Sequence, residues 1–226
     1  MKIVLAAGVE GARSARGLVV VIDVLRAFTV SAYALAGGAR EVLYVAELDE
    51  ARALAARIPG AVLSAEVDGL PVAGVAISNS PTMVAAADLA GRTLVQRSSA
   101  GVQALAAAAG RSTDLFAACL VVAGATARAV RERAPDLVTL VASRGDHVED
   151  GACAAYLADL LQDRTPDLDR LLVPLRASAR YRELAAGAVP GFPPADLDLA
   201  LVADRFNFAL PVEAGAGGRL RVSLPP

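Results

Sequence analysis

Residues 17–30, GLVVVIDVLRAFTV, decide the fold that this sequence predicts. The apolar run at 18–22 is typical of a β-strand that is buried on both faces. Asp23 follows this run directly, and Arg26 comes three residues later. A carboxylate and a guanidinium beside a buried strand cost free energy unless they form an ion pair, bind a metal or hold a ligand. The stretch therefore predicts a parallel-sheet strand with charged groups at its carboxyl end.

Strand-like and helix-like segments alternate along the chain. Apolar, β-branched runs predict strands at 2–5, 18–23, 41–46, 61–64, 92–96, 114–119 and 137–143. Alanine-rich stretches predict helices at 27–36, 48–58, 81–90, 100–109, 123–134 and 149–162. The tail adds helical pieces near 176–186 and 195–204, and its end is expected to add a strand to a sheet edge.

This alternation is typical of an α/β protein. We expect a three-layer α/β/α sandwich with a mixed, largely parallel central sheet. The length of 226 residues suits one domain, so residues 1–226 are expected to form a single domain.

The composition argues against two classes of protein. The chain is 55% hydrophobic, but its longest apolar runs stop short of the roughly 18 residues that a membrane span requires. The first residues offer too short an apolar stretch for a signal peptide, so we expect a soluble, cytoplasmic protein. With a net charge of −2 and no basic stripe among aromatic residues, nucleic-acid binding is not expected. Cys119 and Cys153 lack metal-ligand spacing and are predicted to be small buried residues in a reducing compartment.

Polar side chains gather after the predicted strands, at the edge where open α/β sheets bind ligands. They come from four segments that are far apart in the sequence. These are Asp23 and Arg26; Glu66 and Asp68; Arg97, Ser98 and Ser99; and Arg144, Asp146, His147, Glu149 and Asp150.

The chemistry of this edge is mixed. Carboxylates from separate segments suit a hard cation such as Mg²⁺. Arginines, together with serines that open helices, suit an oxyanion such as phosphate. A metal site beside an anion site is typical of enzymes that transfer phosphoryl groups.

Several of these residues also have a purely structural interpretation. Glu149 and Asp150 can be first-turn acids that favour the helix dipole. Asn79 and Ser80, in the segment SNSP, form a good capping sequence whatever their function. His147, the single histidine, suits a surface or capping position.

Well-known catalytic signatures are absent from the sequence. It contains no GxxxxGK[ST] loop, no GxGxxG after a strand and no GxSxG elbow. With one histidine, a Ser-His-Asp triad has little support.

Five segments, taken in order, resemble the landmarks of the 2-phosphosulfolactate phosphatase family. They are VVVIDVLRAFTV (19–30), ISNSP (77–81), QRSSAG (96–101), GDHVEDGACAAYLADLL (145–161) and DRFNFALPV (204–212). The resemblance implies a Mg²⁺-dependent hydrolase that removes phosphate from a small acidic metabolite, in the type case 2-phospho-3-sulfolactate. It also implies the three-layer fold and a homo-oligomer, expected to be a homodimer.

The resemblance carries roles onto matched residues of this sequence. Asp23 and Arg26 would be catalytic, with either Asp23 or a metal-activated water as the nucleophile. The residues expected to hold Mg²⁺ are Asp23, Glu66, Glu149 and Asp150. Those expected to bind the phosphate are Arg26, Asn79, Ser80, Arg97, Ser98 and Ser99.

Two departures from the family pattern leave an alternative open. Phe28 stands where the family has a threonine, and Val67 stands where it has an arginine. Fewer anion-binding groups would fit a catalytically impaired protein of the same fold that only binds small anions.

Overall fold

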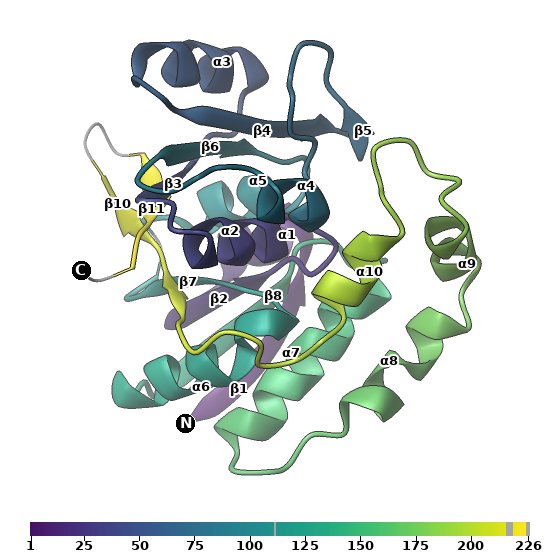
Figure 1. Cartoon of the computed structure of the whole chain (residues 1–226). Helices are drawn as coiled ribbons and strands as arrows, with labels where there is room; N and C mark the ends of the chain where they lie inside the picture. Colours follow the sequence, from purple (N-terminus) through teal and green to yellow (C-terminus); the bar gives the residue numbers. More distant parts are fainter. Residues whose placement is uncertain (111, 216–218, 225–226) are drawn as a thin grey trace.

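The strands divide between two hydrogen-bonded sheets in the computed structural model, which describes residues 1–110, 112–215 and 219–224 (Figure 1). In order, the first sheet contains β1 (Lys2–Ala7), β8 (Leu137–Ala142), β2 (Leu18–Ile22), β7 (Leu115–Ala118) and β9 (Leu210–Pro211). Neighbouring strands in it run parallel, except that β9 is antiparallel to β7.

The second sheet has a parallel centre and antiparallel margins. In order, it contains β10 (Glu213–Ala214), β11 (Leu220–Val222), β3 (Glu41–Tyr44), β6 (Thr93–Arg97), β4 (Val62–Val67) and β5 (Leu70–Pro71). The strands β3, β6 and β4 are parallel, and β11 and β5 pair antiparallel at the two sides.

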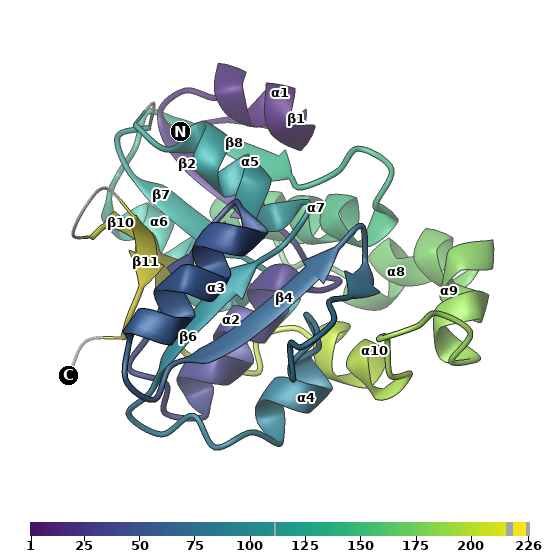
Figure 2. The same ribbon diagram turned by 90° about the horizontal axis from the view of Figure 1, so that it is seen from above.

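Helices cover both faces of each sheet. Helices α2 (Ala27–Ala36) and α5 (Gly101–Ala108) lie between the two sheets, and α3 (Leu48–Arg57) covers the outer face of the second sheet (Figures 1 and 2). On the outer face of the first sheet lie α6 (Ala123–Glu132) and α7 (Val148–Leu161). Each sheet is thus the centre of an α/β/α arrangement, and the α2–α5 layer belongs to both.

The composition explains this shared layer. All five residues of β2 are buried, as the apolar run predicts. In α2, residues 27–35 are all buried, because the helix packs against β3 on one side and β7 on the other. Four of the ten residues of α2 are alanine, so two sheets can approach it closely.

The remaining helical segments have nine residues or fewer. They are α1 (Gly8–Ser14), α4 (Pro81–Ala85), a 3₁₀ turn (Leu120–Val122), α8 (Leu168–Arg176), α9 (Ala179–Ala185) and α10 (Ala195–Ala200). In Figure 1, β4 points towards the side of the molecule where α9 and α10 lie. The segment from α9 to α10 therefore stands near the carboxyl ends of the strands.

The predicted α/β class, with its largely parallel strands flanked by helices, is confirmed, and every strand predicted up to residue 143 is present. The arrangement differs in that two sheets replace the single central sheet, because alternation along the chain does not specify which strands become neighbours. The helix predicted at 81–90 ends at Ala85. The predicted final strand is β11, and residues 218 and 225–226 of that segment lie outside the described residues.

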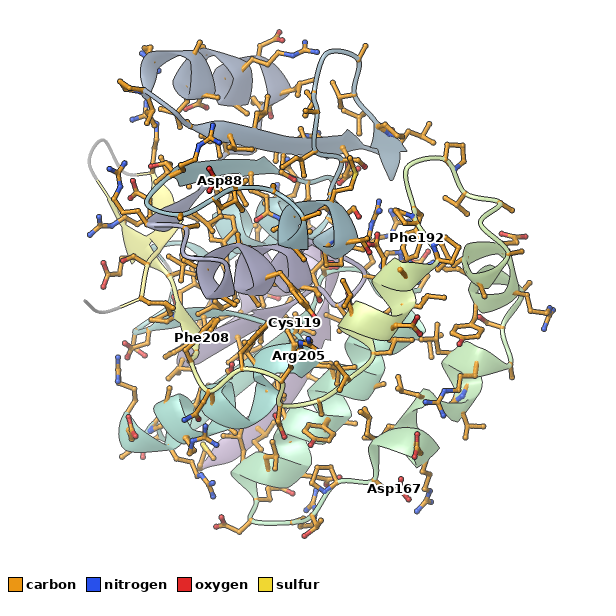
Figure 3. The ribbon with its side chains drawn as sticks, viewed as in Figure 1. Asp88, Cys119, Asp167, Phe192, Arg205 and Phe208 are labelled. Atoms are coloured by element: carbon orange, nitrogen blue, oxygen red, sulfur yellow. The ribbon has the colours of Figure 1, made fainter. Side chains whose placement is uncertain are left out.

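The structure can be compared with two further expectations, on the cysteines and on membrane-spanning helices. Cys119 and Cys153 are both buried and free, as predicted, and Figure 3 shows Cys119 inside the fold. Among the described residues, no helix combines the length and the apolar character needed to cross a membrane.

Candidate active site

A cavity of about 390 Å³ opens at the carboxyl ends of β2, β4, β6 and β8, where the sequence predicts the site. Its walls combine acidic, basic and apolar side chains. The lining residues are Asp23, Leu25, Arg26, Glu66, Asp68, Gly69, Asn79, Ser99, Ala100, Arg144, His147, Arg180, Glu183, Leu184, Val189 and Phe192.

Asp23 lies where the N-termini of two helices meet. Its Oδ1 accepts a hydrogen bond from the backbone N–H of Ala27 at 3.0 Å, and its Oδ2 accepts one from the N–H of Gly101 at 2.9 Å. These residues begin α2 and α5, whose N-termini favour negative charge. Only glycine fits at position 101, because a Cβ there would lie 2.5 Å from Asp23 Oδ2.

The same surroundings change the acidity of Asp23. Burial, together with the negative charges of Glu66 and Glu149, raises the pKa of its carboxyl group to about 6, and the N–H groups of Ala27 and Gly101 oppose this rise. A carboxyl group with a pKa near 6 exchanges protons close to neutral pH, as a general base requires.

Glu66, at the end of β4, is held by a turn of the chain and by Ser99. Its Oε2 accepts hydrogen bonds from the N–H of Gly69 at 2.6 Å and from Ser99 Oγ at 3.1 Å, and its Oε1 accepts one from the N–H of Ser99. Arg97 supports this arrangement from outside the cavity lining. It donates to Ser99 Oγ at 2.8 Å, to the carbonyl of Glu66 and to the carbonyl of Ala46 at 3.2 Å.

Arg26 is buried and fixed by the C-terminal segment. Its guanidinium donates to Asp196 Oδ2 at 3.0 Å and to the carbonyl of Gly191 at 2.6 Å, and it lies 4.5 Å from the ring centroid of Phe192. Figure 3 labels Phe192 in this segment. Burial lowers the pKa of Arg26, and Asp196 opposes that change. Arg26 therefore pairs with Asp196, and not with Asp23.

His147 lines another part of the cavity, and the buried Glu149 lies beside it. Glu149, at the start of α7, is fully buried; its Oε1 accepts a hydrogen bond from Arg180, and its Oε2 has no hydrogen-bond partner among the described residues. His147 Nδ1 lies 3.8 Å from Glu149 Oε1. His147 occupies the N-cap position of α7, as the capping interpretation expects, but its side chain makes no capping bond and lines the cavity. Burial, followed by the charge of Arg180, lowers the pKa of His147.

The sequence also matches a model of a known protein family. The model described as "2-phosphosulpholactate phosphatase" matches residues 5–184. The chain belongs to this family.

Individual relatives of the 2-phosphosulfolactate phosphatase family agree. The chain is 37% identical over 145 residues to a protein of Bacillus subtilis, an alignment that covers 63% of each chain. It is 36% identical over 148 residues to one of Carboxydothermus hydrogenoformans (65% of this chain, 61% of that one) and 32% identical over 163 residues to one of Deinococcus radiodurans (69% and 68%). Each of the three is named "Probable 2-phosphosulfolactate phosphatase". The match spans just under two thirds of the length of the first two.

The residues that resemble the family landmarks divide into two groups. Asp23, Arg26, Glu66, Asn79 and Ser99 line the cavity. The others, Ser80, Arg97, Ser98, Glu149 and Asp150, are not among its lining residues and contact the structure around it.

Three of this second group hold neighbouring elements in place. Ser80 caps α4 by accepting from the N–H of Met83, and it donates to Asp196. Ser98 accepts from the N–H of Val102 in α5. Asp150 accepts from the N–H of Val24 and from Ser143 Oγ; burial raises its pKa well above the usual value.

Sequence reasoning missed Asp196, Arg180 and Phe192. Asp196 is fully buried, although an acid near the start of a short helix after two prolines usually indicates a solvated first turn. Nothing in the local sequence marks these three residues. Arg180 and Phe192 line the cavity, and Asp196 holds Arg26 through an ion pair.

The carboxylates of the cavity offer donors for a cation. The described residues contain no group of three or more His, Cys, Asp and Glu side chains arranged to hold a metal ion. Mg²⁺, however, commonly takes only one or two protein carboxylates and completes its shell with water and substrate phosphate. Asp23 and Glu66, with the unpartnered Oε2 of Glu149, have the chemistry that this mode of binding needs.

Proposed function

We propose that the protein is a phosphoric monoester hydrolase that acts on a small phosphorylated acid, 2-phosphosulfolactate or a similar phospho-hydroxy acid. One observation carries the proposal. Asp23, with a pKa of about 6, lies in a cavity that is also lined by Arg26, Arg144 and Arg180. An anionic substrate would meet positive charge beside a group able to take up a proton at neutral pH.

Hydrolysis needs few chemical steps from the protein. Water attacks phosphorus, the bond between phosphorus and the ester oxygen breaks, and inorganic phosphate and an alcohol leave. Ionised Asp23 either takes a proton from the water that attacks phosphorus, or attacks phosphorus itself. On the second route the ester bond breaks as an aspartyl phosphate forms, and a water molecule then hydrolyses this adduct, which releases inorganic phosphate and regenerates Asp23. On either route the alcohol oxygen takes its proton from solvent. The arginines bind the phosphoryl and acidic groups of the substrate, which is the positioning on which phosphoryl transfer depends.

Mg²⁺ is part of this proposal. Asp23 and Glu66, together with Glu149, would hold it, and when bound it would neutralise charge on the phosphoryl oxygens. Burial raises the pKa of Asp23, and the negative charges of Glu66 and Glu149 add to this rise; their repulsion supports a cation in this place.

The alternative of an impaired anion-binding protein rested on Phe28 and Val67. Phe28 is fully buried and packs edge to face against Tyr44, with ring centroids 5.9 Å apart. Val67 is among the exposed residues of β4. Neither Phe28 nor Val67 lines the cavity.

Phosphate release tests the proposal. Purified protein is assayed on a panel of phosphorylated hydroxy acids that includes phosphosulfolactate, with Mg²⁺ and with EDTA. We expect release that requires Mg²⁺ and is lost in folded Asp23→Asn. Folded protein that binds phosphate but releases none from any substrate would instead support the anion-binding alternative.

A quench experiment separates the two roles of Asp23. If Asp23 attacks phosphorus, acid quenching during turnover traps an aspartyl phosphate, visible as the mass of one phosphoryl group on the peptide that contains Asp23. If water attacks directly, no such adduct forms.

We also propose a cytoplasmic homodimer. Two free, buried cysteines suit a reducing compartment. Val4 and Leu5, on the edge strand β1, are 37% and 64% exposed and offer an apolar strip to a second copy. Sedimentation of the purified protein as a monomer at micromolar concentration would contradict the dimer.

A further inference from the structure

A chain of buried hydrogen bonds runs from the interior of the second sheet to the cavity. The hydroxyl of Tyr44 in β3 donates to Ser31 Oγ in α2 at 3.0 Å, and Ser31 Oγ donates to Gln96 Oε1 in β6 at 2.7 Å. Gln96 Nε2 then donates to Asn79 Oδ1 at 3.1 Å. Tyr44, Ser31, Gln96 and Asn79 are all buried, and only Asn79 lines the cavity.

A backbone group sets the direction of this chain. Gln96 Nε2 also donates to the carbonyl oxygen of Ala27 at 2.7 Å. A carbonyl can only accept, so an inverted Gln96 amide would place two acceptors 2.7 Å apart. Ser31 Oγ, a hydroxyl that can donate or accept, is compatible with this orientation, so the carbonyl of Ala27 alone decides it.

The orientation of Gln96 determines that of Asn79. The second N–H of Gln96 Nε2 needs an acceptor, and the Asn79 atom that faces it is Oδ1. Asn79 Nδ2 therefore points away from Gln96. It donates to none of the described residues and is not among the buried unpartnered atoms, so it lies at the cavity wall. Asn79 thus presents two N–H donors, and not a carbonyl oxygen, to whatever occupies the cavity.

We infer that Gln96 is a positioning residue, which fixes the amide of Asn79 with its donor end towards an oxyanion of the substrate. The inference rests on the proposed function, because the oxyanion is the phosphoryl group of the substrate. Four carboxylates also line this cavity, those of Asp23, Glu66, Asp68 and Glu183. An Asn79 that turned its oxygen inwards would add to their repulsion of an anion, so the direction of this amide matters for binding.

A double-mutant cycle on the affinity for inorganic phosphate, measured by calorimetry with Mg²⁺ present, tests the inference. We expect Asn79→Leu to weaken binding about 10- to 100-fold, as expected for loss of hydrogen bonds to a charged group. Gln96→Met, which is similar in size but cannot orient Asn79, should weaken binding about 2- to 10-fold. In the Asn79→Leu background, Gln96→Met should have no further effect on affinity, because Gln96 acts only through Asn79.

Gln103→Met is the matched control. Gln103 Nε2 donates to the carbonyl of Ala46 at 2.9 Å, and Gln103 does not line the cavity, so the same substitution there removes one hydrogen bond without touching Asn79. Its phosphate affinity should equal that of the parent protein. If Gln96→Met weakens binding as much in the Asn79→Leu background as alone, or leaves it unchanged in the parent, the inference is wrong.

Binding and turnover fail separately in this design. Loss of phosphate release from every substrate, with the cycle intact, would overturn the proposed hydrolase and leave the role of Gln96 standing. If Gln96→Met and Asn79→Leu weaken phosphate binding additively in an enzyme that still releases phosphate, the role of Gln96 is overturned and the proposed hydrolase stands.

Discussion

Replacing Asp196 by alanine should destabilise the protein severely. Its carboxylate is fully buried and accepts three hydrogen bonds, from Arg26 at 3.0 Å, from Ser80 Oγ at 2.7 Å and from the N–H of Thr82 at 3.0 Å. Without it, the buried guanidinium of Arg26 loses its counter-charge, and removal of one partner from a buried ion pair costs about 3–5 kcal/mol. Since domains are stable by only about 5–15 kcal/mol, the loss is a large part of the total.

Urea denaturation followed by circular dichroism measures this loss, because the chain has no tryptophan to report it by fluorescence. Asp198→Ala is the matched control, since Asp198 lies exposed on the same helix and should change the free energy of unfolding by less than about 0.5 kcal/mol. A loss below about 1 kcal/mol for Asp196→Ala would refute the reasoning, because it would show that Arg26 does not depend on Asp196.

Three further predictions concern the cavity. The carboxyl group of Asp23 has a pKa of about 6 in the folded state and near 3.8 in the unfolded chain, so the folded state binds this proton more tightly. In metal-free buffer, the protonated group should therefore contribute about 3 kcal/mol to the free energy of unfolding at low pH, and this contribution should be lost as pH rises from about 4 to 6. Asp23→Asn should flatten this part of a stability–pH curve measured in the same metal-free buffer. Gly101→Ala should lower kcat by about 100-fold by displacing Asp23, whereas Gly151→Ala, whose Cβ meets no atom within 4 Å, should leave it unchanged. Arg144→Met should raise KM about 10-fold with little change in unfolding free energy, since Arg144 is half exposed and, among the described residues, forms one ion pair, an exposed one with Asp146.

The local pattern of the sequence was enough to predict the strands and one edge of the site. The uninterrupted apolar run at 18–22 indicates a strand buried on both faces, and β2 is such a strand. Asp23, Glu66 and Ser99 were expected to meet because parallel strands of one sheet share a carboxyl edge, although β2 belongs to the first sheet and β4 and β6 belong to the second. They do line one cavity.

Side-chain direction at the strand ends could not be predicted in the same way. Successive residues of a strand point to opposite faces, so a shift of one residue exchanges the two sides. Arg97, expected to bind phosphate, donates to Ala46 and Glu66, whereas its neighbour Gln96 points to α2 and Asn79. The apolar pattern of β6 does not specify this register, because both faces of the strand are buried.

Contacts over long sequence separations were also beyond the sequence. Asp196 follows Arg26 by 170 positions, and its role depends on how α10 packs against α4. The sequence offers only an acid near a helix start, which is common in solvated first turns. A buried partner for Arg26 could be expected on physical grounds, but its identity required the fold.

The Arg26–Asp196 pair raises the question of what a buried ion pair contributes here. Apolar residues of similar size often replace such a pair with no loss of stability, so stability alone does not explain why it is present. We therefore expect Arg26→Met/Asp196→Leu to regain most of the unfolding free energy that Asp196→Ala loses, apart from the hydrogen bonds of Ser80 and Thr82. It should still fail to bind phosphate, because the guanidinium that Asp196 orients at the cavity wall is gone. Phosphate binding at the parent affinity by this stable double variant would show that Arg26 serves the fold and not the site.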